Sequence, residues 1–263
     1  MMTAPLMEQL VRQALILDEQ ALALLQSASP EADAIHDSRV AIKRLRALWQ
    51  LLRPWLRRDH HKAFDHNLRD GARALSGARD THVMATTLGK LAGKAGKPQR
   101  KAISRVQKTL FPADNHADSS VCQSATRESL QQDYRRWQQL SLVLSDHELL
   151  VSGLARTYKQ CRNHSLAAQG SQQAQPWHAL RKWVKYLLYQ QRALADCGLA
   201  APFKDADLNR LGKWLGKLHD LDVLQTHLQQ HQTKIEPVSD LQQALAAISE
   251  QARHLQTKCD SAS

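Results

Sequence analysis

A row of basic side chains follows one face of a predicted helix in the first third of the chain. It begins in the segment HDSRVAIK, and its members are His36, Arg39, Lys43, Arg46, Arg53 and Arg57. Steps of three, four and seven residues keep side chains on the same side of a helix. Arginine donates two parallel hydrogen bonds to a phosphate, and lysine supplies a point charge. The row is therefore typical of a surface that binds an elongated phosphate anion.

The charge balance of this row leaves two interpretations open. Asp37 is the only acidic residue between His36 and Arg57. Cations three and four residues apart on a helix repel one another by a few tenths of a kcal/mol per pair. Either an anionic ligand neutralises the row, or neighbouring helices supply acidic partners.

A second, weaker row appears in the other half of the chain. His178, Arg181, Lys185 and Arg192 share a helix face, and Lys182 lies beside it. The segments LSGARDTHV and LGKLHDLDV follow the first and second rows in the same order and at nearly the same separation. This internal repeat predicts two duplicated halves, at about 1–144 and 145–263.

Further basic positions extend the candidate surface. Lys101, Arg105 and Lys108 form a third row, and Arg73 and Lys213 occupy matching positions ahead of Asp80 and Asp220. The two aspartates are expected between helices, where each would cap the next helix or hold a neighbouring arginine.

The elements that position these residues are predicted to be helices throughout. Gly and Pro are few, at 10 and 8, and the sequence is rich in good helix formers. Ser145 and Glu148 have the spacing of a capping box. The expected helices span residues 4–27, 31–53, 60–76, 81–92, 98–110, 122–140, 146–168, 177–195, 205–218, 221–234 and 239–258.

Composition limits the class of protein. The formal net charge is +11, which favours a polyanionic partner such as polyphosphate, nucleic acid or an anionic membrane. The histidines lack the close spacing of a metal site, and the four cysteines are far apart, as expected for free thiols in a reducing compartment. No signal peptide or membrane-spanning stretch is recognisable. We expect a cytoplasmic protein without a metal or cofactor.

The segments HDSRVAIKRLRALWQLLRP and WHALRKWVKYLLY resemble the two signatures of the CHAD domain, a histidine-containing α-helical domain, and the segments after them resemble those that follow each signature. The likeness covers nearly the whole chain as a single domain. One departure is Leu188, where the second signature usually has a basic residue; Tyr189 is kept.

This resemblance implies an all-α fold of two antiparallel helical bundles, related by a pseudo-twofold axis around a basic central pore or cleft. It also implies non-enzymatic binding of inorganic polyphosphate and association with polyphosphate granules. Contacts carried over from the two signatures are His36, Arg39, Lys43, Arg44, Arg46, His178, Arg181, Lys182, Lys185 and Tyr189. The basic rows add Arg53, Arg73, Lys101, Arg105, Lys108 and Lys213 as expected polyphosphate contacts.

Three other functions compete with this interpretation. Nucleic-acid binding fits the charge, although aromatic residues are not interleaved with the basic rows and no recognition motif is present. A phosphohydrolase or kinase would need a phosphate loop or an acidic metal cluster, and neither is evident. An adaptor for an acidic protein is the third possibility.

Overall fold

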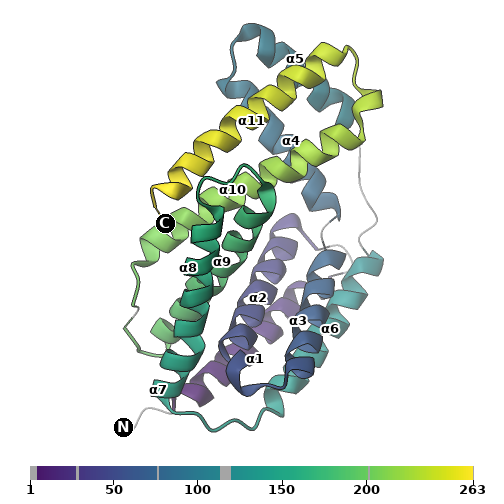
Figure 1. The fold of residues 1–263 in the computed structure, drawn as a ribbon. Helices are drawn as coiled ribbons and strands as arrows, with labels where there is room; N and C mark the ends of the chain where they lie inside the picture. Colours follow the sequence, from purple (N-terminus) through teal and green to yellow (C-terminus); the bar gives the residue numbers. More distant parts are fainter. Residues whose placement is uncertain (1–4, 28–29, 76, 113–119, 201, 263) are drawn as a thin grey trace. The chain divides into compact units, whose positions relative to one another are not determined.

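The structure, a computed structural model, describes residues 5–27, 30–75, 77–112, 120–200 and 202–262 (Figure 1). Every regular element in this part of the chain is helical, which confirms the predicted all-α class. The elements are α1 (Leu6–Leu24), α2 (Ala32–Leu51), η1 (Arg53–Trp55), α3 (Arg58–Ala74), α4 (Gly77–Lys94), α5 (Lys97–Leu110), α6 (Ser120–Gln138), α7 (Asp146–Glu148), η2 (Leu149–Leu154), α8 (Ala155–Ala168), α9 (Ala174–Asp196), α10 (Asp205–Gln230), η3 (Gln232–Lys234) and α11 (Val238–Asp260). No described helix is long and apolar enough to cross a membrane.

The chain divides into two compact units. Unit 1 comprises residues 1–76, 118–166 and 182–209, and unit 2 comprises residues 77–117, 167–181 and 210–263. Each unit draws segments from both sides of residue 144, so this division differs from the one expected from the repeat. The pseudo-twofold relation and the central pore stay predictions.

Unit 1 is built on α1, α2, α3 and α6. α1 and α3 each pack against both α2 and α6. The core contains Trp49 and Trp137, whose stacked ring centroids are 3.8 Å apart. Both indole N–H groups donate to the buried Asp133 carboxylate, at 2.9 and 3.0 Å. This arrangement fixes α2 against α6, because a buried carboxylate is stable only when its oxygens accept hydrogen bonds.

A second carboxyl group is buried in unit 1 without such support. Asp18 on α1 is fully buried, and neither of its carboxyl oxygens has a hydrogen-bond partner among the described residues. Burial raises the pKa of Asp18 above its usual value, and the neighbouring Asp133 and Glu19 raise it further. Asp18 is therefore held as a neutral acid.

Unit 2 contains α4, α5, α11 and parts of α9 and α10. α5 packs against both α4 and α11. Amide side chains of α5 reach the backbone of its neighbours: Gln107 donates to the Ala85 carbonyl at 3.0 Å, and Gln99 donates to the Gln243 carbonyl at 3.3 Å. These contacts hold α5 in place between its two partners.

The predicted break near Asp220 is wrong. α10 runs continuously from Asp205 to Gln230, so Asp220 lies inside a helix and does not cap one. The reason lies in the apolar spacing, because buried leucines continue through the motif at positions 211, 215, 218, 221, 224 and 228. Asp80 lies in the first turn of α4, and its side chain is outside the described part of the structure.

The predicted cap at Ser145 is confirmed. Its hydroxyl accepts a hydrogen bond from the Glu148 N–H, and the Glu148 carboxylate accepts one from the Ser145 N–H at 2.8 Å. The helix that starts here changes to a π-helical segment over Leu149–Leu154 before α8. Within that segment, a Cβ on Gly153 would lie 2.8 Å from the carbonyl oxygen of Leu51. Glycine thus permits a close approach to the end of α2.

Candidate functional site

The first basic row lies on α2 as far as that helix extends. His36, Arg39, Lys43 and Arg46 are all half-buried, while Ile42, Leu45 and other apolar side chains of the helix are buried. α2 ends at Leu51, shortly before Pro54, so Arg53 belongs to η1 and Arg57 precedes α3. The proline explains this end, since it cannot continue a helix.

Arg46 faces an acidic partner on α3. Its Nε donates to Asp65 Oδ1 at 2.8 Å, and the two side chains are 19% and 23% exposed. Burial alone would raise the pKa of Asp65, but the hydrogen bond and charge of Arg46 outweigh burial, and the pKa is lowered. The alternative of acidic partners from neighbouring helices is therefore realised at Arg46.

Other cations gather around this ion pair. Arg53, Arg156 on α8 and Lys182 on α9 all act electrostatically on His61, a buried residue of α3. Together with Arg46 and Asp65 they form the Asp65 cluster, which comprises Arg46, Arg53, His61, Asp65, Arg156 and Lys182. All six belong to unit 1. The cluster so defined contains four cations and one carboxylate, and Asp70 of α3 also acts electrostatically on Arg46.

The pKa directions in the Asp65 cluster reflect burial first and neighbouring positive charge second. Burial is the main cause that lowers the pKa of His61 to about 4, and Arg53 lowers it further. Burial also lowers the pKa of Arg156, again with help from Arg53. Within the described residues, Arg53, Arg156 and Lys182 form no ion pair. The cluster therefore holds unneutralised charge.

Aromatic rings and backbone groups support these cations. The Lys182 ammonium lies 5.5 Å from the ring centroid of Trp183 and 5.8 Å from that of Tyr186. Arg156 donates to the carbonyl of Gln50 at 3.2 Å. Burial is the main cause that lowers the pKa of Lys182, partly opposed by Asp65. These contacts position the charged groups without neutralising them.

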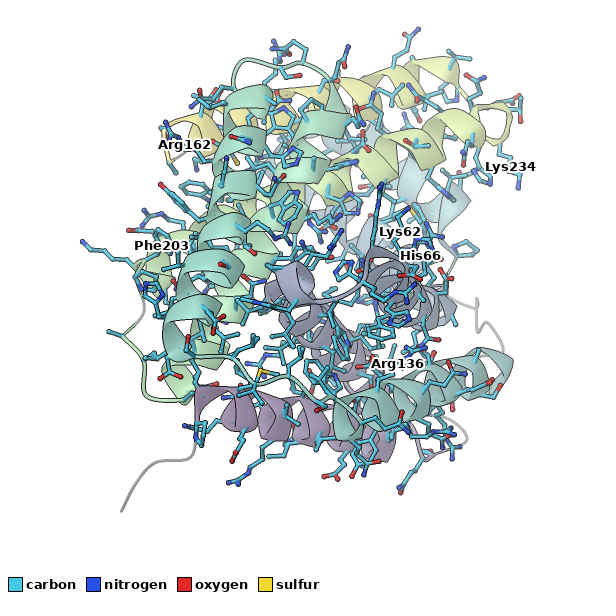
Figure 2. The ribbon with its side chains drawn as sticks, turned by 60° about the horizontal axis from the view of Figure 1, so that its bottom comes forward. Lys62, His66, Arg136, Arg162, Phe203 and Lys234 are labelled. Carbon is cyan, nitrogen blue, oxygen red and sulfur yellow. The ribbon has the colours of Figure 1, made fainter. Side chains whose placement is uncertain are left out.

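The outer side of α3 adds exposed polar groups. Lys62 and His66 are one turn apart and project from the same helix (Figure 2). The guanidinium carbon of Arg136 on α6, also labelled in Figure 2, lies 4.7 Å from the ring centroid of Phe64. Burial is the main cause that lowers the pKa of Arg136, against the opposing effect of Asp133. This arginine is therefore part of the packing of α6 on α3.

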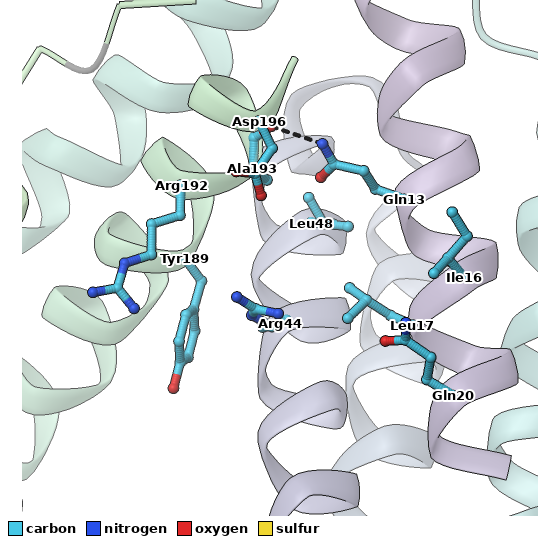
Figure 3. Close-up of a pocket in the computed structure, with 10 residues that line it drawn as sticks. All are labelled: Gln13, Ile16, Leu17, Gln20, Arg44, Leu48, Tyr189, Arg192, Ala193 and Asp196. Atoms are coloured by element: carbon cyan, nitrogen blue, oxygen red, sulfur yellow. Dashed lines mark hydrogen bonds between the residues drawn. The ribbon is translucent and has the colours of Figure 1, made fainter. Parts of the chain in front are cut away.

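Arg44 lies in a separate cavity of unit 1. Successive residues of a helix are about 100° apart, so Arg44 and Arg46 point to different sides of α2. Arg44 lines a cavity of about 340 Å³ together with Tyr189 and Arg192 of α9 and residues of α1 (Figure 3). Arg192 is already bound to Asp205 by two hydrogen bonds of 2.6 and 2.7 Å. Arg44 and Tyr189 are thus brought together, away from the Asp65 cluster.

In the second signature, His178 contacts polar side chains of α10. Its Nε2 lies 3.2 Å from His219 Nδ1 and 3.3 Å from Asp222 Oδ2. Arg181 is half-buried, and Lys185 lies 5.9 Å from the ring centroid of Tyr189. Leu188 is buried in the core. Of the basic residues expected from this signature, Lys182 is the one that joins the Asp65 cluster.

The remaining expected contacts are dispersed. Lys101 and Lys108 are exposed on α5, and Lys213 is exposed on α10. Arg105 is bound to Asp240 of α11, with 2.6 Å between Nη2 and Oδ1. Arg73 is exposed and lies 4.0 Å from Asp70.

Sequence reasoning missed three members of the Asp65 cluster. His61 and Asp65 lie in the segment RRDHHKAFD, where their helical spacing of four residues was a usable signal. Arg156 gave no local signal, because only long-range packing brings α8 near α3 and α9.

Metal ligation finds no support in the described residues, where no group of three or more His, Cys, Asp or Glu side chains is placed to hold an ion. Cys161 and Cys259 are buried thiols, and burial raises their pKa values to about 11 and about 12. The side chain of Cys122 lies outside the described part. The candidate site, the Asp65 cluster, consists mainly of side chains with nitrogen donors.

Comparison with known proteins identifies the fold. The "Crystal structure of the CHAD domain from the plant Ricinus communis" matches with a TM-score of 0.67 and 16% sequence identity, covering 99% of this chain and 92% of that chain. No curated protein matches the sequence. A family model described as the CHAD domain matches residues 10–229, most of the chain. This chain therefore belongs to the CHAD domain family.

Proposed function

We propose that the protein binds inorganic polyphosphate without chemically altering it, and that the Asp65 cluster is its main contact. The observation that carries the proposal is the charge imbalance at this cluster, where four cations outnumber Asp65 and the neighbouring Asp70. Three of them, Arg53, Arg156 and Lys182, have no ion-pair partner among the described residues. A phosphate chain relieves the repulsion among these cations when it binds.

Each group in the cluster has a defined role in this proposal. The guanidinium groups of Arg53 and Arg156 offer paired N–H donors to phosphate oxygens. Lys182 supplies a point charge. His61 is neutral because its pKa is about 4, so it offers one N–H donor and no charge. Binding by such a cluster weakens as salt rises, because counterions released into a concentrated solution gain less entropy.

Two single substitutions test the role of the cluster in opposite directions. Lys182→Ala removes a cation and is expected to weaken binding to long-chain polyphosphate and to make the log–log salt slope shallower by about one. Asp65→Asn removes the opposing charge and is expected to tighten binding. Lys159→Ala, at an exposed lysine of α8 outside the cluster, is the matched control.

The measurement is a dissociation constant for polyphosphate at several salt concentrations, with circular dichroism confirming that each variant folds. Equal binding by wild type, Lys182→Ala and Asp65→Asn would refute the proposal. Displacement of polyphosphate by DNA or RNA at equal phosphate concentration would instead favour nucleic-acid binding. Release of phosphate from the polymer in the presence of Mg²⁺ would contradict the non-enzymatic assignment, and co-purification with an acidic protein regardless of polyphosphate would favour an adaptor.

The proposal also gives an expected location, which is the cytoplasm at polyphosphate granules. A fluorescent fusion should then mark these granules, and the Lys182→Ala fusion should mark them less strongly. A fusion that stays diffuse in granule-containing cells would contradict this location.

A further inference from the structure

Unit 2 contains a cleft that the basic rows of the sequence did not reveal. It has a volume of about 440 Å³ and is lined by residues of α4, α10 and α11. Four lysines line it: Lys90 and Lys94 from α4, Lys217 from α10 and Lys258 from α11. The volume is within the range of small-molecule sites.

The charge of this cleft is strongly positive. Among the described side chains that line it, Asp220 is the one carboxylate, against the four lysines. Within the part of the chain that the structure describes, Lys90, Lys217 and Lys258 form no ion pair. Lys94 donates to the Gln251 side chain at 3.0 Å, which links α4 to α11. Such a cleft attracts an anion with several negative charges.

The floor of the cleft is apolar and includes an indole. Leu91, Leu221 and Leu255 are largely buried and line it together with Trp214. The Lys258 ammonium lies 6.0 Å from the Trp214 ring centroid, and the Arg210 guanidinium lies 5.7 Å from it. A purely ionic polymer makes no use of an apolar floor, whereas a ligand with a flat ring and a phosphate chain uses both the indole and the lysines.

We propose that this cleft binds a nucleoside triphosphate, with the base against Trp214 and the leucine floor and the phosphates at the lysines. An aromatic side chain stacks on any base, so the contacts described here do not distinguish among bases. The inference is independent of polyphosphate binding, because the two sites lie in different units and share no residue.

The test uses ATP without added metal, measured by equilibrium dialysis, with tripolyphosphate as the base-free probe. Lys217→Gln/Lys258→Gln is expected to weaken the binding of both probes by about tenfold or more. Trp214→Leu is expected to weaken ATP binding by about tenfold and to change tripolyphosphate binding by less than about twofold. Arg253→Gln, at an exposed position of α11 that does not line the cleft, is the control and should match wild type.

Three results would overturn the proposal: no ATP binding, ATP binding that survives Lys217→Gln/Lys258→Gln, or equal losses of the two probes in Trp214→Leu. A DNA or RNA oligonucleotide that binds the cleft much more tightly than ATP would overturn it in favour of a nucleic acid. Lys182→Ala, altered only in unit 1, should bind ATP as wild type does. Failure of polyphosphate binding and failure of nucleotide binding are thereby distinguishable.

Discussion

Replacing Asp18 with asparagine should make the protein more stable at neutral and alkaline pH. Asp18 is fully buried and its carboxyl oxygens have no hydrogen-bond partner among the described residues. Burial, with the nearby Asp133 and Glu19, raises its pKa. Folding therefore requires Asp18 to take up a proton above pH 4, whereas asparagine is neutral at every pH.

The sign of the pH dependence follows from this raised pKa. The unfolded chain loses the Asp18 proton near its ordinary value of 3.8, while the folded chain retains it to higher pH. Asp18 therefore costs no stability below pH 4, and the free energy of unfolding falls as the pH rises above this value. Retaining a proton at pH 7 costs at most about 4 kcal/mol, at about 1.36 kcal/mol for each pH unit. Since relaxation lowers this cost, we expect Asp18→Asn to gain about 1–3 kcal/mol at pH 8 and little at pH 4.

Urea unfolding, followed by circular dichroism at several pH values between 4 and 8, measures this gain. Glu250→Gln, at an exposed position of α11, is the control for removal of a carboxylate and should leave the free energy of unfolding nearly unchanged. Parallel stability curves for wild type and Asp18→Asn across this range would refute the reasoning, as would a variant that is less stable at pH 8.

Two further predictions concern packing in unit 1. Asp133→Asn should lower the free energy of unfolding by about 1–3 kcal/mol, because an amide nitrogen cannot accept one of the two indole N–H bonds. Urea unfolding at pH 7 measures this change. Unchanged stability would contradict the role of the buried Asp133 side chain. Gly153→Ala should cost about 1–3 kcal/mol, because the new Cβ would lie 2.8 Å from the Leu51 carbonyl oxygen. Gly93→Ala, where a Cβ has nothing within 4 Å, should leave the free energy of unfolding unchanged or raise it by up to about 1 kcal/mol. Equal shifts of the melting temperature in Gly153→Ala and Gly93→Ala would exclude a steric cause.

Helix content could be predicted from the sequence because its signals are local. The capping box at Ser145 depends on residues three apart, and the structure contains it as predicted. The predicted break near Asp220 is wrong because the repeated segment was expected to lie between helices, while the buried leucines on both sides keep one helical period. Apolar spacing was the more reliable signal.

The site could be predicted only in part, since ion pairing depends on long-range packing. Arg46, Arg53 and Lys182 were expected contacts and lie in the Asp65 cluster, but Arg156 comes from a helix without a basic row. Arg105 and Arg192 look equivalent to free cations in the sequence, yet Asp240 and Asp205 neutralise them. The lysines of the unit 2 cleft are dispersed over three helices, so no local pattern joins them.

The environment of His61 determines whether the charge of the Asp65 cluster changes with pH. Histidine is the usual side chain by which proteins sense acidity near neutral pH. Because the pKa of His61 is about 4, its protonation state does not change between pH 5 and pH 8. His61 therefore stays neutral when the pH changes over this range, and it is a constant uncharged donor within the Asp65 cluster.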